Sequence, residues 1–244
     1  MSALLRAELL KLRTTRTFAA LVGVAVLLSL LLLVLSTLLR DQFDEEDLQA
    51  LFAGDFTPLF ILLLGIMGIT GEWRHRTITS SVLAEPDRLR LLGAKLISYA
   101  VAGAVLSLVV TVTLMVVGTV ILSMRDKPTL DVVPLLDVLW RNLVGAAYLG
   151  ALGVCLGALL RNQVAALVGV LIAFVIVEPA LIGLVNDVGR YAPLQAAPAG
   201  LVGIGFEDDE DFLLEPVAAA LVMVAWLTVL FSAAALLLRR RDLA

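Results

Sequence analysis

Few side chains in this sequence could carry out catalytic chemistry. His75 is the only histidine and Cys155 the only cysteine, and Cys155 lies inside an apolar run. A lone histidine cannot assemble a zinc site, and a lone cysteine can form neither a disulfide within the chain nor a thiolate cluster. The phosphate-binding pattern G-x-x-x-x-G-K-[ST] is absent, as are H-E-x-x-H and G-x-S-x-G. We therefore expect no enzymatic activity, no metal and no cofactor in this chain.

Two polar features interrupt an otherwise apolar chain. The first is the stretch GEWRHRTITSSVLAEP at 71–86. The second is Glu178, a carboxylate well inside an apolar run, where an ionised side chain costs roughly 2.5 kcal/mol or more unless it is paired or hydrated. Glu178 could form a proton or sodium site. However, Pro179 directly after it favours a structural role, in which the helix breaks near the outer leaflet and the carboxylate meets water or a freed backbone amide.

The composition indicates that these residues belong to a membrane protein. The 244-residue chain is 61% hydrophobic and 16% charged, whereas soluble domains are roughly 45–50% apolar and about 25% charged. Runs that cross the hydrocarbon layer must be helical, because backbone polar groups find no water there. We predict an all-α membrane protein with a single domain over 1–244. Its six spans are expected at about 18–39, 57–71, 96–124, 143–160, 164–185 and 217–238.

Basic residues predict the orientation of these spans. Of the 18 Lys and Arg residues, 13 fall on the side that carries both termini, and such residues are retained in the cytoplasm. We expect a multi-pass plasma-membrane protein with both termini cytoplasmic. Its cytoplasmic loop would occupy 72–95, and its external loops 40–56, 125–142 and 186–216. The acidic runs at 41–47 and 207–211 then lie outside as solvated loops, and a net charge of −4 gives no indication of nucleic-acid binding.

The predicted cytoplasmic loop resembles that of the ABC-2 type transporter permeases. In that family a Glu-x-x-x-x-Thr pattern, a short helix, a proline, an arginine and a lysine follow the second span. The positions here are Glu72, Thr77, Pro86, Arg90 and Lys95, with Arg76 where the family often has glycine. The resemblance implies that a coupling helix at about 77–84 docks into a groove of a separate ATPase. The candidate coupling residues are Glu72, Trp73, Arg74, His75, Arg76, Thr77, Ile78, Pro86 and Arg90.

The start of the sequence resembles the amphipathic elbow helix of the same family. LLRAELLKLRTTRTF predicts a helix at about 3–16, with Leu5, Leu9 and Leu12 on one stripe and Glu8 beside it. Such a helix can lie in the headgroup layer with its basic side on anionic lipid. A simple topology signal is the alternative interpretation. The candidate elbow residues are Arg6, Leu9, Lys11 and Arg13.

Glycines in the fourth predicted span form a face of small residues. Gly153 and Gly157 have the G-x-x-x-G spacing, and Gly150 extends the same face. Small residues let helix backbones approach closely. Because glycine is common in membrane helices, we favour packing within one subunit over a seam between two copies.

The resemblance implies the permease subunit of an ATP-driven exporter. Two copies, expected to form a homodimer surrounded by lipid, would combine with two cytoplasmic ATPase subunits that bind ATP and Mg²⁺. The substrate would be an amphiphilic or hydrophobic drug, antimicrobial peptide or lipid. One alternative is an immunity or mechanotransmission complex that passes no cargo. Another is an ion-coupled transporter or channel that uses Glu178, although such machines have matched broken helices in both halves and this sequence shows one break.

Overall fold

A computed structural model describes residues 2–40, 42–75, 77, 83, 85, 87–160, 162–203 and 213–240. All regular secondary structure in these residues is helical. Six helical segments of the described chain are long and apolar enough to cross a membrane. The prediction of an all-α membrane protein with six spans is therefore confirmed.

The described helices follow one another with few long connections. The first half contains α1 (Ser2–Thr14), α2 (Arg16–Leu39), α3 (Glu45–Ala53), α4 (Thr57–Arg74) and α6 (Arg88–Met124). The second half contains α7 (Val132–Leu160), α8 (Gln163–Ile172), the π-helical turn η1 (Ala173–Val177), α9 (Glu178–Leu184), α10 (Asn186–Gly189), α11 (Ala196–Val202) and α12 (Pro216–Arg240).

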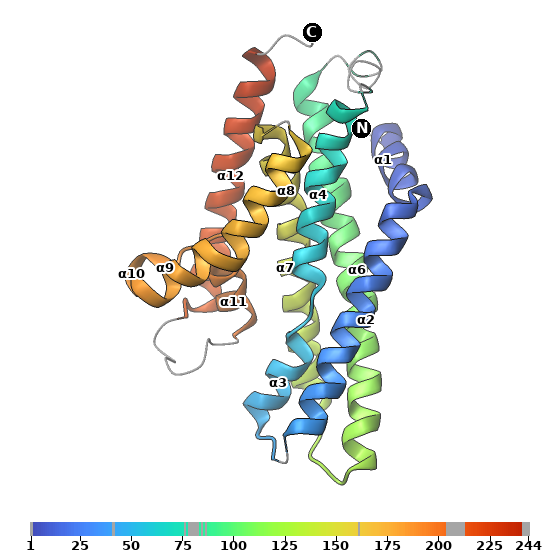
Figure 1. Cartoon of the computed structure of the whole chain (residues 1–244), viewed down its shortest axis with the longest axis vertical. Coiled ribbons are helices and arrows are strands. Elements are labelled where there is room, and N and C mark those ends of the chain that lie inside the picture. Colours follow the sequence, from blue (N-terminus) through green and yellow to red (C-terminus); the bar gives the residue numbers. More distant parts are fainter. Residues whose placement is uncertain are drawn as a thin grey trace.

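The spans pack around α7 as the central helix. It contacts α4, α6 and α12, and 67% of its most apolar stretch is buried, compared with 17% for α2. The outer helices leave large apolar side chains exposed along their length, as helices facing lipid do. Figure 1 shows α1, the end of α4, the start of α6 and the end of α12 at one end of the bundle, which we call the terminal end.

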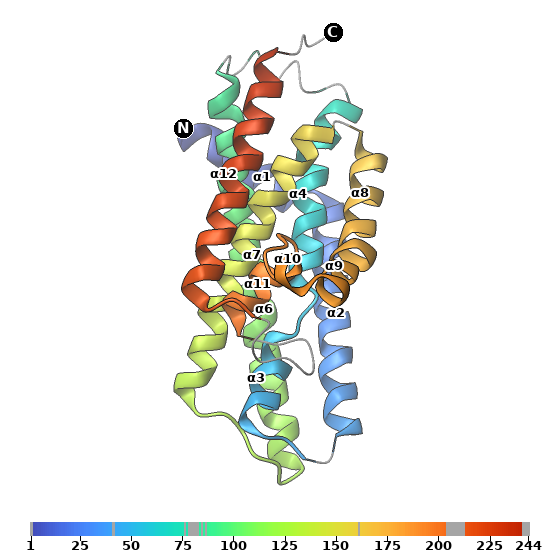
Figure 2. The same cartoon turned by 90° about the vertical axis from the view of Figure 1, so that its left-hand side faces the viewer.

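At the terminal end, α1 runs across the bundle rather than along it. Figure 2 shows α1 passing behind the other helices before α2 turns down the long axis. Thr15 separates the two helices and adopts an extended backbone conformation. The chain therefore begins with a short transverse helix followed by a span, in the order predicted from the sequence.

Several helices extend beyond the apolar runs that predicted them. α4 continues to Arg74 and α6 already begins at Arg88, so that helices occupy both ends of the predicted loop at 72–95. α7 begins at Val132, which shortens the predicted external loop at 125–142. An apolar run marks the part of a helix that lies in hydrocarbon. Side-chain caps and contacts with other helices determine where the helix begins and ends. At α6 the Asp87 carboxylate accepts from the backbone N–H groups of Leu89 and Arg90.

The predicted loops on the opposite end also contain helices. α3 lies within the predicted loop at 40–56, where the Asp44 side chain accepts from the N–H of Asp47 at 2.8 Å and caps the helix. α10 and α11 lie within the predicted loop at 186–216.

The fifth span is one apolar segment made of three pieces, α8, η1 and α9. Pro179 has no N–H, so the carbonyl of Val175 lacks its α-helical partner, and the chain passes through a π-helical turn just before the proline. The break that Pro179 predicted is therefore a local change of helix type, and Glu178 lies directly after it.

Candidate functional site

Four charged side chains meet where α1, α4 and α6 come together at the terminal end. Lys95 Nζ donates to Glu8 Oε2 at 2.9 Å and to Glu72 Oε1 at 2.7 Å. Lys11 Nζ donates to Glu8 Oε1 at 2.9 Å and to Glu72 Oε1 at 3.0 Å. Each lysine thus bridges the same two carboxylates. We call Glu8, Lys11, Glu72 and Lys95 the charge cluster.

The charge cluster is buried at its centre and open at one edge. Lys95 is 1% exposed, Glu8 4% and Glu72 8%, whereas the side chain of Lys11 is 55% exposed. Two lysines balance two carboxylates, so the cluster has no net formal charge. Removing one partner of a buried pair leaves an uncompensated charge and typically costs about 3–5 kcal/mol. The cluster therefore fixes α1 against the ends of α4 and α6.

For Glu8 and Lys11, the two cluster residues on α1, the charged partners together shift the pKa more than burial does. Burial alone raises the pKa of Glu8, but the neighbouring Lys95 and Lys11 more than offset it and lower the pKa below its ordinary value. Burial likewise lowers the pKa of Lys11, and the bonds to Glu8 and Glu72 reverse this and raise the pKa. Both shifts favour the charged forms of Glu8 and Lys11 near neutral pH.

The inward face of α1 differs from the predicted apolar stripe. Glu8 and Leu12, one helical turn apart, are buried, whereas Leu9 is 38% exposed. The leucine stripe alone does not place Glu8 on the inward face, because the pattern does not show that Glu8 has two lysine partners. Arg6 and Arg13 are exposed, which leaves their charges free to meet a surface.

The predicted coupling residues fall into three groups in the structure. Glu72 points inward, while Arg74, His75, Thr77 and Arg90 are exposed and Trp73 is half-buried. Arg90 pairs with Asp87 at 3.2 Å. Arg76, Ile78 and Pro86 lie outside the described residues, and so does most of the predicted coupling helix at 77–84. Sequence reasoning placed Lys95 in the family motif but missed its bond to Glu8, because the two residues lie 87 positions apart.

Two further contacts tie the flanks of the 75–87 segment to the rest of the terminal end. Arg74 donates to the side chain of Gln163 on α8 at 3.3 Å. Arg88, in the first turn of α6, donates to the carbonyl of Leu238 on α12. Together with the charge cluster, these contacts connect the ends of α4 and α6 to α1, α8 and α12.

Comparison with known families decides which class of membrane protein this is. The model of the ABC-2 family transporter protein matches residues 4–179, which run from α1 to the first residues of α9 and include the whole charge cluster. The chain belongs to the ABC-2 transporter family. The family that the sequence resembles is thus confirmed. No curated protein matches the chain closely enough in sequence to be reported as a relative.

Membership of the ABC-2 family makes this chain a multi-pass membrane transport subunit, of a family whose members in general partner with an ABC ATPase. In this ABC-2 permease, three of the four glycines of α7 lie against neighbouring helices of the same chain. A Cβ on Gly150 would lie 2.3 Å from the carbonyl oxygen of Tyr99 on α6, and one on Gly153 2.3 Å from that of Leu62 on α4. A Cβ on Gly157 would lie 2.9 Å from the carbonyl oxygen of Ile66. These glycines allow the close approach of backbones at the centre of the bundle.

Glu178 of this ABC-2 permease anchors a backbone turn. Its Oε1 accepts from the N–H of Leu194 and its Oε2 from the N–H of Gln195, each at 2.7 Å, and the residue is 4% exposed. Gln195 directly precedes α11. Each carboxylate oxygen therefore accepts from a backbone donor, which is the arrangement of a structural anchor.

Proposed function

We propose that this chain is the membrane-spanning subunit of an ATP-driven exporter. Two copies would assemble with two cytoplasmic ATPase subunits, which would supply the ATP and Mg²⁺ sites that this sequence lacks. The cargo would be an amphiphilic or hydrophobic molecule. Family membership and the distribution of basic residues, which predicts that the terminal end faces the cytoplasm, support this function.

The observation that carries the proposal is the charge cluster. Glu72 and Lys95 lie on the two helices that flank the 75–87 segment, and Glu8 joins both through Lys95 and Lys11. An ATPase that pushes on this segment would therefore move α1, α4 and α6 together. The work must come from a difference in the contacts that nucleotide-bound and nucleotide-free ATPase make with the permease.

The alternatives are distinguished by what the cluster and Glu178 do. An immunity or mechanotransmission complex would use the same cluster without passing cargo, so only a transport assay separates it from an exporter. An ion-coupled mechanism would need a carboxylate that is free to exchange its partner, whereas both oxygens of Glu178 are bound to backbone amides.

The test begins with a gentle pull-down of the chain from its native membranes. We expect an ATPase to be recovered in stoichiometric amount, and the purified complex in liposomes to accumulate ethidium when ATP is supplied. In the variant Glu72→Gln the complex should still assemble, but ethidium transported per ATP hydrolysed should fall about fivefold or more, as the loss of a typical coupling free energy predicts.

The matched control is Glu46→Gln, the same chemical change at an exposed position of α3 on the opposite end. It should behave like the unmodified complex. Adding Lys11→Met to Glu72→Gln restores charge balance in the cluster and should recover part of the coupling. Normal transport per ATP in Glu72→Gln, in a complex that has assembled, would remove the cluster from the mechanism.

A further inference from the structure

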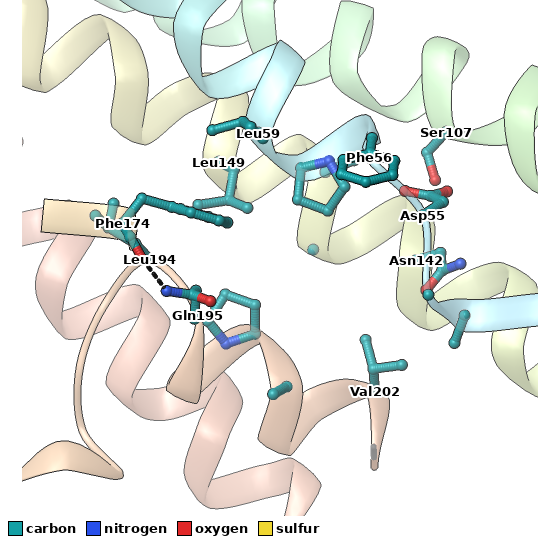
Figure 3. Close-up of a pocket in the computed structure, with 17 residues that line it drawn as sticks. Asp55, Phe56, Leu59, Ser107, Asn142, Leu149, Phe174, Leu194, Gln195 and Val202 are labelled. Atoms are coloured by element: carbon teal, nitrogen blue, oxygen red, sulfur yellow. Dashed lines mark hydrogen bonds between the residues drawn. The ribbon is translucent and has the colours of Figure 1, made fainter. Parts of the chain in front are cut away.

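A cavity of about 350 Å³ lies where the chain between α3 and α4 leaves its helical path. Its walls come from residues 53–59, α6, α7, η1 and the segment that leads into α11. Figure 3 shows Asp55, Ser107 and Asn142 gathered on one side of this cavity, with Phe174, Leu149 and Leu59 on the other. The cavity is thus polar at one end and mainly apolar at the other, where Gln195 lies beside Phe174.

The break between α3 and α4 is held in place by side chains of neighbouring helices. The N–H of Phe56 donates to Ser29 Oγ on α2 at 3.0 Å, and Asn142 Nδ2 on α7 donates to the carbonyl of Phe52 at 3.5 Å. Non-helical backbone within a membrane-spanning segment is tolerated where it is buried in protein or lines a cavity. Here the non-helical backbone lines the cavity and places Asp55 on the cavity wall.

Asp55 is incompletely satisfied at this position. Its Oδ1 accepts from the N–H of Thr57 at 2.8 Å, whereas Oδ2 is buried and makes no hydrogen bond. The hydroxyls of Thr57 and Thr111 interact with the carboxyl group, but neither bonds Oδ2 with normal geometry. The buried hydroxyl of Ser107, also on the cavity wall, likewise lacks a partner. Among the described residues that line the cavity, Asp55 alone carries a formal charge.

We propose that this cavity binds a lipophilic amine, with the ammonium group on Asp55 and Ser107 and the apolar body against Phe174, Leu149 and Leu59. A carboxylate in such surroundings is costly without a cation, and an ammonium group supplies both the charge and the N–H donors. A bare metal ion fits less well, because it requires several oxygen ligands and most of the residues that line the cavity are apolar. The volume suits a small amphiphile.

This inference rests on the proposed export function only in treating the bound amine as cargo. Binding itself is measured on the permease without an ATPase, in nanodiscs, by equilibrium dialysis of radiolabelled dodecylamine against empty nanodiscs. Dodecyltrimethylammonium, which has the charge but no N–H, and dodecanol, which has a donor but no charge, are the comparison probes. We expect saturable binding in the order dodecylamine, then dodecyltrimethylammonium, then dodecanol.

Two variants test the site from different directions. Asp55→Asn keeps the shape and removes the charge, and should weaken dodecylamine binding about tenfold or more while leaving dodecanol nearly unchanged. Gly145→Leu extends a side chain into the cavity from a position where a Cβ meets no atom within 4 Å, and should weaken all three probes. Gly169→Leu is the matched control, since a Cβ there also meets nothing within 4 Å and Gly169 does not line the cavity.

Dodecylamine binding that is equal in the unmodified protein, Asp55→Asn and Gly145→Leu would overturn the proposal, because the amine would then bind elsewhere or only partition into lipid. If Asp55→Asn does not fold, Gly145→Leu alone decides between these outcomes. A failure of the exporter function would appear instead in the Glu72→Gln transport assay, and would leave an Asp55-dependent amine site standing.

Discussion

A single carboxylate, Glu8, changes the interpretation of the first helix. In the sequence it is one of several charges beside a leucine stripe, yet it is 4% exposed and bonded to both Lys11 and Lys95. A buried charge is stable where it is paired and hydrogen-bonded, and Glu8 meets both conditions. The residue therefore holds α1 in place, and its partners set the pH range in which it can do so.

We predict a stability plateau in pH that the charge cluster sets. Glu8 has a lowered pKa, so its contribution is fully present above the ordinary value of 4.5 and is lost as the pH falls through its lower pKa in the folded protein. Lys11 has a raised pKa, so its contribution is present below 10.5 and is lost as the pH rises through the raised value. Thermal unfolding of the unmodified protein and of Glu8→Gln, compared across pH, measures the first effect.

The difference in melting temperature between the unmodified protein and Glu8→Gln should be constant near neutral pH and shrink as the pH falls below about 4.5. Lys11 is half exposed, so solvent screens its part and the alkaline effect should be the smaller one. A difference that stays unchanged down to about pH 3 would show that the pKa of Glu8 is not lowered in the folded protein.

At the scale of elements, the contact of α7 with α4 depends on small residues at particular positions. We predict that Gly153→Ala lowers the free energy of unfolding by about 1–3 kcal/mol, the usual cost of overpacking a tight contact. The reason is that the new Cβ would lie 2.3 Å from the carbonyl oxygen of Leu62, so two backbones would have to separate. Unfolding by dodecyl sulfate titration in mixed micelles provides the measurement.

Gly145→Ala is the matched control for that prediction. It makes the same substitution in the same helix, but its Cβ would meet no atom within 4 Å. Because alanine favours the helix over glycine, this variant should be neutral or slightly stabilising. Equal losses in both variants would mean that the cost does not come from the contact with α4, because Gly145 makes no such contact.

The six membrane-spanning helices could be predicted from the sequence. The positions of their polar ends could not. Apolar runs and the hydrocarbon thickness locate six spans, and family order locates the transverse helix before the first. The ends of α4 and α6 were missed because both helices continue through polar residues such as Glu72 and Lys95. These residues are stable in a buried helix only through partners on other helices, which hydropathy does not register.

At the scale of the whole molecule, the features missed are those that depend on long-range contacts. Glu8 and Lys95 are 87 residues apart, and the cavity combines residues from 53 to 202. Asp55 was included only in a predicted external loop at 40–56. The signal that could have identified it was Gly54-Asp55 between two apolar runs, which marks a break inside a membrane segment rather than a loop outside one.

The exporter function requires that the terminal end face the cytoplasm, and this can be measured with single cysteines. Native Cys155 is 0% exposed, so a membrane-impermeant maleimide should leave the unmodified protein unlabelled. We predict that Asp131→Cys, between α6 and α7, is labelled on intact cells, whereas His75→Cys is labelled only after lysis. The opposite pattern would place Arg74, His75 and the charge cluster outside the cell. No cytoplasmic ATPase could then reach the segment between α4 and α6, and the exporter mechanism would fail however well the cluster holds the helices together.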